Sequence, residues 1–294
     1  MSWILCCLFL LVGFRSSFAQ EAQPAPVQAA FVWGEQEIQR GEPVEAVLRL
    51  QIQEGWHIYW KNPGRMGLPM EIEWQLPEGW RIGQIDWSAP QFVHTEESGL
   101  DPVLFGYEKE ALLLVTLYPP DSWAGIEKPH LQAQINWLAC SDTSCWPGAC
   151  VADADRSLPE HPKQVWDRAH EQIPSRYLVS AEEQGRGRLS LPLHIKDGDK
   201  VLGGEFFPDE GEKGVRVTAF DVDPEEHALA FIPHQAGVLT VRLRDGEGER
   251  VRAFALSLEQ PLAINSTSDG MNSPSTPPLI SSEFEGGLLF ALIL

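Results

Sequence analysis

The chain has 294 residues, of which 43% are hydrophobic and 22% are charged, a globular composition with enough length for two domains of ordinary size. Its 22 Lys and Arg residues stand against 42 Asp and Glu residues, which gives a formal net charge of −20. Such a charge repels a phosphate backbone, so the composition excludes nucleic-acid binding as the main function. Solubility is its simplest explanation, although a docking surface for a basic partner would have the same sign.

Residues 1–19 have the pattern of a secretory signal peptide. An apolar run from Trp3 to Phe14 is followed by the small-x-small cleavage pattern Ser17-Phe18-Ala19, although no Lys or Arg precedes the run. The run is too short to span a membrane. We therefore expect export of the chain. Two of the five cysteines lie inside the run, so the mature chain keeps Cys140, Cys145 and Cys150.

Short apolar runs separated by Gly, Pro and acidic residues fill residues 20–158. They read "AAFVWG", "VEAVLRLQIQ", "WHIYWKN", "MEIEWQL", "ALLLVTLYP" and "LQAQINWLA". Many short strands at this spacing predict an all-β sandwich. In the last run Ala133, Ile135 and Trp137 alternate with polar residues, and Cys140 leaves the strand on the more polar face.

Residues 159–181 interrupt this pattern and predict a short helical linker. Val165, Trp166, Ala169 and Ile173 have helical spacing and lie between two prolines. Strand-like runs then return, and they predict a second, smaller β-sandwich over residues 182–258.

Residues 259–285 are rich in Ser, Thr, Pro and Asn and predict a flexible linker. The sequence then ends on seven uninterrupted apolar residues, Leu288 to Leu294, whereas a spanning helix needs about 20. We expect residues 286–294 to be the start of a truncated transmembrane helix. A native apolar tail is the alternative, but it would expose that surface to water.

Three cysteines fall within the stretch "NWLACSDTSCWPGAC". An extended chain would separate Cys140 and Cys145 by about 16 Å, beyond the roughly 7 Å limit for a disulfide, so they can pair only across a tight turn. The residues "SDTS" between them are turn formers. So small a loop adds little stability, which favours a redox role, with an ordinary structural disulfide as the alternative. Cys150 is either a free thiol or another partner for Cys145.

Two metal sites are conceivable. The three thiolates with His161 or His130 could bind zinc, and His57 with Met66 and Met70 could bind cuprous copper. The cysteine spacing is looser than that of zinc knuckles, and an oxidising compartment disfavours free thiolates. The alternation around His57 is typical of a half-buried strand. We therefore expect neither a metal nor another cofactor.

Three segments carry a family resemblance. "GWHIYWKNPGRMGLPMEIEWQLPEGW" (55–80), "FGYEKEALLLV" (105–115) and "WLACSDTSCWPG" (137–148) resemble the N-terminal extracytoplasmic region of DsbD-type thiol:disulfide interchange proteins. The nearest branch is the one associated with copper tolerance and called ScsB. The resemblance covers most of residues 30–155 and, more loosely, the second β-domain. It implies immunoglobulin-like sandwiches, the first of which carries one dithiol/disulfide pair.

The resemblance also implies roles for particular residues. By motif position the pair is Cys140 and Cys145, with Cys145 as the exchanging sulfur and Cys140 as the resolving one. Phe105 and Tyr107 correspond to an aromatic cap that shields the pair. The spacing of the two cysteines departs from that of the best-known members, and Cys150 is an additional thiol.

The implied function is a relay of electrons. They would come from cytoplasmic thioredoxin through a membrane domain and a thioredoxin-like domain of the same protein, and leave to periplasmic thiol oxidoreductases. The chain would then lie on the periplasmic side of the bacterial inner membrane. No basic residue lies between Leu138 and Val151, so no local charge favours a thiolate there. The alternatives are a copper-handling or partner-docking sandwich with a structural disulfide, and a plain adhesive sandwich.

Overall fold

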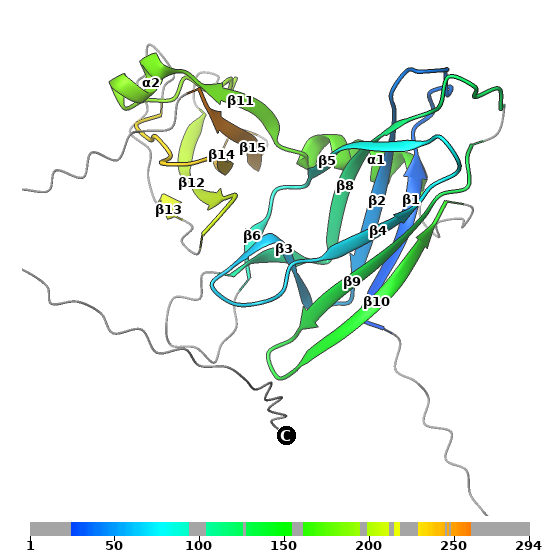
Figure 1. Cartoon of the computed structure of the whole chain (residues 1–294). Coiled ribbons are helices and arrows are strands. Elements are labelled where there is room, and N and C mark those ends of the chain that lie inside the picture. The colour runs from blue at the N-terminus through cyan, green and yellow to red at the C-terminus, as the bar shows by residue number, and fades with distance from the viewer. Residues whose placement is uncertain are drawn as a thin grey trace, which may run out of the picture. The chain divides into compact units, whose positions relative to one another are not determined.

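The computed structural model describes residues 25–93, 104–125, 128–154, 161–194, 199–211, 215–217, 229–244, 246 and 248–259. The predicted signal peptide, the predicted flexible linker apart from Glu259, and the predicted start of a transmembrane helix lie outside these residues. Within them, no helix has both the length and the apolar character needed to cross a membrane. The described chain forms three β-sheets and two helices (Figure 1).

The first sheet has four antiparallel strands in the order β1-β2-β8-β5. They are β1 (Val27–Trp33), β2 (Val44–Ile52), β8 (Glu110–Tyr118) and β5 (Arg81–Trp87). The central strands β2 and β8 are buried along most of their length. Continuous burial of this kind means that both faces of the sheet are covered, rather than one.

The second sheet has six strands in the order β10-β9-β3-β7-β6, with β4 also paired to β9. They are β10 (Cys145–Asp153), β9 (Gln132–Cys140), β3 (His57–Gly64), β7 (Leu104–Glu108), β6 (Gln91–Phe92) and β4 (Glu71–Gln75). In β9, Ala133, Ile135 and Trp137 are buried and the residues between them are not. The alternation predicted for this strand is confirmed.

The inner faces of these two sheets share one hydrophobic core, which fits the sandwich architecture that the sequence predicts. The first sheet contributes mainly aliphatic side chains, and the second contributes aromatic and aliphatic ones. The core includes Ala46, Leu48, Leu50, Leu113 and Val115 from the first sheet, and Ile58, Trp60, Ile135 and Trp137 from the second. Each fully buried side chain of this size stabilises the fold by about 1.5–3 kcal/mol.

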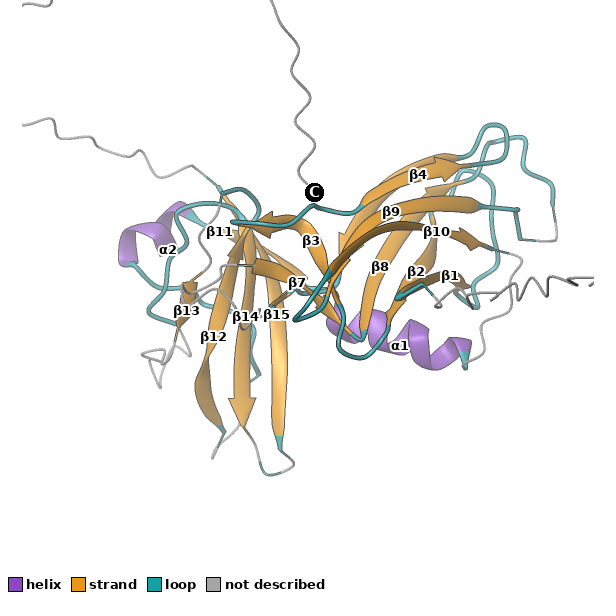
Figure 2. Ribbon diagram, turned by 90° about the horizontal axis from the view of Figure 1, so that it is seen from below, coloured by secondary structure: helices purple, strands orange, loops and turns teal. Residues whose placement is uncertain are grey.

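Helix α1 (Pro162–Gln172) is the helix predicted between two prolines. It starts with a proline in its first turn and ends at Ile173, which is extended and precedes Pro174. The helix lies along the outer face of the first sheet (Figure 2). Its residues Val165 and Ala169 pack on that face. The side chains that they cover are Val32, Val47, Leu112 and Leu114.

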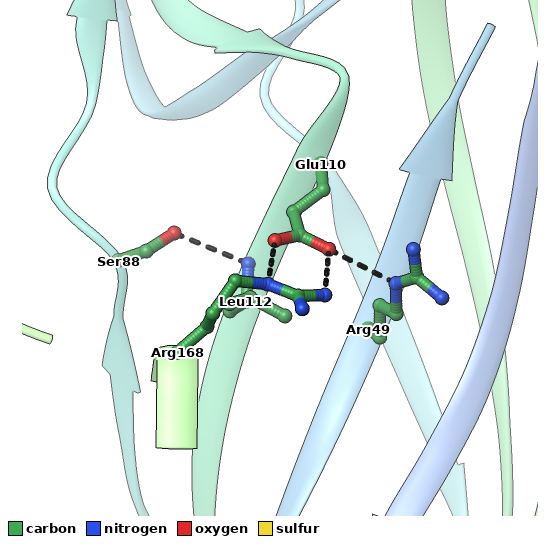
Figure 3. A network of polar contacts seen from close by, with 5 residues as sticks. All are labelled: Arg49, Ser88, Glu110, Leu112 and Arg168. Carbon is green, nitrogen blue, oxygen red and sulfur yellow. Dashed lines mark hydrogen bonds and ion pairs between the residues drawn. The ribbon is translucent and has the colours of Figure 1, made fainter. Parts of the chain in front are cut away.

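A carboxylate with two arginines fastens this helix to the sheet (Figure 3). Arg168 of α1 donates to Glu110 twice, at 2.8 and 3.0 Å, and Arg49 of β2 donates at 3.0 Å. Burial by itself raises the pKa of the Glu110 carboxyl, but the hydrogen bonds and charges of Arg168 and Arg49 outweigh it and hold that pKa below its ordinary value. The ionised carboxylate therefore favours the docked helix.

The third sheet has the order β11-β15-β14-β12-β13, with β11 parallel to β15 and the other pairs antiparallel. The strands are β11 (Ser175–Val179), β12 (Lys200–Pro208), β13 (Val215–Val217), β14 (Gly237–Arg244) and β15 (Glu249–Leu258). Helix α2 (Ala181–Arg186) follows β11 and starts at a capping box between Ser180 and Glu183.

The strand β11 falls within the range predicted as a linker. Its burial alternates over a short stretch, with Tyr177 and Val179 packed on a hydrophobic cluster and Arg176 and Leu178 exposed. The boundaries of the linker and of the second β-domain stay predictions. The described residues of the range predicted as a second β-domain contribute to this sheet and to a hydrophobic cluster that includes Leu189, Leu191, Phe206, Leu239, Val241, Phe254 and Leu256.

Candidate functional site

Strands β9 and β10 form a hairpin (Figure 1). Its register places two cysteines directly opposite each other. Cys140 ends β9 and Cys145 begins β10, and their sulfurs form a disulfide with a Cα–Cα distance of 4.0 Å. Residues opposite each other in an antiparallel pair have side chains on the same face, which lets them bond across the hairpin. The tight turn that the spacing required is therefore present.

Serine side chains hold that turn. The backbone N–H of Ser141 donates to the carbonyl of Ser144 at 2.8 Å. The Ser141 hydroxyl oxygen accepts from the N–H of Ser144 at 3.2 Å. Hydroxyl groups that bond backbone groups two or three residues on stabilise tight turns. These bonds within "SDTS" thus stabilise the turn that places Cys140 opposite Cys145.

The two cysteines differ in exposure. Cys140 is 1% exposed, whereas Cys145 belongs to the exposed part of β10. A thiolate that opens a disulfide must reach one of its sulfurs directly. The arrangement therefore offers Cys145 to an attacking protein and hides Cys140.

A small apolar cluster on the outer face of the second sheet covers Cys140. It contains Tyr59, Val93, Leu104 and, half-buried, Leu138. The Tyr59 hydroxyl donates to the Cys140 sulfur at 3.4 Å. Burial raises the pKa of Tyr59, so the hydroxyl keeps its proton at neutral pH and remains a donor.

The structure does not bring the predicted cap residues into this cluster. Phe105 and Tyr107 point to the inner face of β7 and belong to the sandwich core. Phe105 packs against Phe207 with a ring-centroid distance of 5.4 Å, and the Tyr107 hydroxyl donates to the Ser88 carbonyl at 2.7 Å. Their role as a cap stays a prediction, and the aromatic residue in contact with the sulfur is Tyr59.

Sequence reasoning missed Tyr59. It lies two residues after His57 in the "GWHIYWKN" segment, on the opposite face of β3 from Ile58 and Trp60. Strand periodicity could have placed Tyr59 on the outer face. It could not have placed β3 beside β9, because 81 residues separate Tyr59 from Cys140.

The third cysteine is separate from the pair. Cys150 lies five residues after Cys145 on one strand, and an odd separation puts two side chains on opposite faces. Cys150 is a free, half-buried thiol that packs against the sandwich core, and burial raises its pKa. It is therefore no alternative partner for Cys145.

The residues considered for metal binding are also apart. Met70 is buried in the sandwich core and Met66 is 53% exposed, while His57 lies on β3. Two of the three thiols are joined in the disulfide. In the part of the chain that the structure describes, no three His, Cys, Asp or Glu side chains gather in a geometry that could hold a metal ion.

The model of one protein family matches residues 21–152, and its description reads "Thiol:disulfide interchange protein DsbD, N-terminal". The resemblance of this part of the chain to the N-terminal region of DsbD-type proteins is therefore confirmed. The matched range contains both cysteines of the disulfide and the whole of the β9–β10 turn. No curated protein matches the chain.

Two similar solved structures are also N-terminal domains. The N-terminal periplasmic domain of ScsB from Proteus mirabilis is 16% identical, with 74% of this chain and 90% of that chain covered and a TM-score of 0.36. The reduced DsbD N-terminal domain from Neisseria meningitidis is 13% identical, with 44% and 86% covered and a TM-score of 0.27. At these identities, the roles of individual residues have to be argued from this chain itself.

Proposed function

We propose that Cys140 and Cys145 are a redox-active pair through which this chain relays electrons by thiol:disulfide exchange. The observation that carries the proposal is the asymmetry of the disulfide, with a buried sulfur on Cys140 and an exposed one on Cys145. The family whose model matches residues 21–152 is named for the same chemistry.

The exchange transfers two electrons in two displacements. A thiolate of the electron donor attacks the Cys145 sulfur, the Cys140–Cys145 bond breaks, and its electron pair stays on the Cys140 sulfur. A second thiol of the donor then displaces Cys145, which leaves this chain as a dithiol and the donor as a disulfide. The reverse sequence, with Cys145 as the attacking thiolate, passes the electrons to an acceptor disulfide. Cys140 closes the cycle by displacing the acceptor from Cys145.

The partners follow from this chemistry. The donor would be a thioredoxin-like domain of the same protein, and the acceptors would be periplasmic thiol oxidoreductases. The family assignment and the signal-peptide pattern of residues 1–19 support a place on the periplasmic side of the inner membrane. An association with copper tolerance rests on the resemblance to the ScsB branch.

The test is a redox titration of the chain from residue 20 onward. The protein is equilibrated in glutathione buffers, the free thiols are alkylated, and the modified peptides are identified by mass spectrometry. We expect the Cys140–Cys145 bond to be the labile one. We also expect the Cys140→Ser variant to form a stable mixed disulfide through Cys145 with a thioredoxin variant whose resolving cysteine is replaced by serine and whose remaining cysteine is activated as a disulfide with a small thiol. A bond that stays intact under a strongly reducing poise would leave a structural disulfide in a binding module.

A further inference from the structure

Four side chains form one row across the outer face of the second sheet. The strand register places Glu108 of β7 opposite His57 of β3, His57 opposite Cys140 of β9, and Cys140 opposite Cys145 of β10. Neighbouring strands lie about 4.8 Å apart, and opposite residues share a face. A carboxylate, an imidazole, the buried sulfur and the exposed sulfur therefore follow one another in this order.

The imidazole of His57 is enclosed at its place in the row. His57 is 5% exposed, and its ring meets the Tyr59 ring edge to face at a centroid distance of 5.4 Å. The Tyr59 hydroxyl is the group that donates to the Cys140 sulfur. The Nε2 atom of His57 is buried and has no hydrogen-bond partner among the described residues. An imidazole nitrogen in this position can accept or donate a proton.

Acidic groups act on His57 from two other elements. Burial lowers the pKa of His57, whereas the charges of Glu108 on β7 and Asp142 in the β9–β10 turn act in the opposite direction. These are the charged groups that act on the ring in the described part of the chain. The ring is thus neutral in the resting protein, and nearby carboxylates can stabilise it once it is protonated.

The resolving step at Cys140 needs a nearby group that can accept the proton of the thiol. Cys140 lies in an apolar cluster, and apolar surroundings disfavour a thiolate. No basic residue lies between Leu138 and Val151 to offset this. The resolving step nevertheless requires a thiolate at Cys140, so a base beside the sulfur would accelerate it.

We propose that His57 takes the proton of the Cys140 thiol in the resolving step and returns it in the opposite direction, with Glu108 stabilising the imidazolium. This inference rests on the proposed function. In the forward step the Cys140 proton moves to His57, and the thiolate attacks the Cys145 sulfur of the mixed disulfide. The Cys140–Cys145 bond forms, and the acceptor sulfur leaves with the electron pair of the broken bond. His57 then releases the proton to solvent.

The experiment follows the resolving step with glutathione disulfide as the acceptor. The reduced chain is mixed with the probe, the reaction is quenched with acid at intervals, and the Cys145–glutathione adduct is quantified by mass spectrometry. In the His57→Gln and His57→Phe variants we expect the adduct to form at the normal rate and to resolve about 100-fold more slowly. The resolution rate should also lose the pH inflection that His57 gives the natural protein.

Two further variants separate this role from a merely structural one. Glu108→Gln removes a charge that raises the pKa of His57, so it should move the inflection to lower pH. His130→Gln, which replaces an exposed histidine outside the row, should leave the adduct lifetime and the pH profile unchanged.

The outcomes are distinct. Resolution at the natural rate and with the natural pH profile in both His57 variants overturns the role of His57 and leaves the redox pair intact. A natural protein that forms no adduct at Cys145 contradicts the proposed function itself. If circular dichroism shows that neither variant folds, the test is the pH dependence of the resolution rate in the natural protein. A resolution rate with no inflection below the pH at which the Cys140 thiol itself ionises excludes His57 as the base.

Discussion

The outer faces of the two sandwich sheets have different coverings. On the first sheet, Val47, Leu112 and their neighbours are covered by helix α1, which the Glu110 carboxylate fastens. On the second sheet, a small cluster around Tyr59 covers Cys140, and the adjoining Cys145 stays exposed. Closing one face with a helix stabilises the sandwich, and leaving the other open keeps one sulfur within reach of another protein.

Glu108 and Glu110, which are separated by a single residue, also differ in role between the two sheets. Glu108 ends β7 in the second sheet, Glu110 begins β8 in the first, and Lys109 between them has a left-handed backbone with φ of 64°. Glu110 binds two arginines that hold a helix, whereas Glu108 is exposed and lies opposite His57. A carboxylate thus serves stability on one sheet and, in our proposal, proton transfer on the other.

The largest effect is expected from the exposed sulfur. Cys145→Ser should abolish exchange with thioredoxin, because serine cannot form the mixed disulfide. Cys150→Ser should keep the natural rate, because that thiol packs against the core on the opposite face of β10. The measurement is the rate at which reduced thioredoxin is oxidised by each variant. Oxidation of thioredoxin that survives in Cys145→Ser would contradict the proposed redox pair, because this variant lacks the Cys140–Cys145 disulfide.

The two glutamates should differ strongly in their effect on stability. Glu110→Ala removes the carboxylate shared by Arg49 and Arg168, and we expect it to lower the free energy of unfolding by about 3 kcal/mol. The matched variant Glu108→Ala should change it by less than about 0.5 kcal/mol, because Glu108 is exposed. Urea denaturation at pH 7 measures both. If both variants lose the same free energy of unfolding, the two carboxylates do not differ in their contribution to stability.

The contribution of Glu110 should also depend on pH. Its pKa in the folded protein is held below the ordinary value of 4.5, so it stabilises the fold above that pH and the contribution is lost as the pH falls through the folded pKa. The difference in unfolding free energy between the natural protein and Glu110→Gln should be largest at neutral pH and shrink toward pH 3. Urea denaturation across this range tests it, and a constant difference would contradict it.

The smallest effect is expected at Tyr59. Tyr59→Phe removes the hydroxyl that donates to the Cys140 sulfur, so the reduced Cys140 should form its thiolate less readily. We expect its alkylation at pH 8 to slow by about two- to fivefold, with a stability change below about 1 kcal/mol. Tyr107→Phe serves as the control, because its hydroxyl donates to the Ser88 carbonyl in the core. A similar slowing in both variants would point to a general loosening of the sheet.

Local sequence determined the parts of this protein that depend on neighbouring residues. The alternation in residues 131–140 predicted β9 and the face of Cys140, the "SDTS" segment predicted the turn, and two prolines delimited helix α1. Each of these follows from backbone preferences or from a period of two or 3.6 residues. The family resemblance of residues 55–80 and 137–148 predicted the cysteine pair.

Tertiary structure decided which strands are neighbours. The pairing of β3 with both β7 and β9 sets His57 beside Glu108 and Cys140, although the three residues are far apart in the sequence. The same pairing places Phe105 in the sandwich core and Tyr59 beside the Cys140 sulfur. Register between distant strands is set by the packing of one whole face against another, which no local pattern encodes. The sulfurs could therefore be found in the sequence, but the side chains that act on them could not.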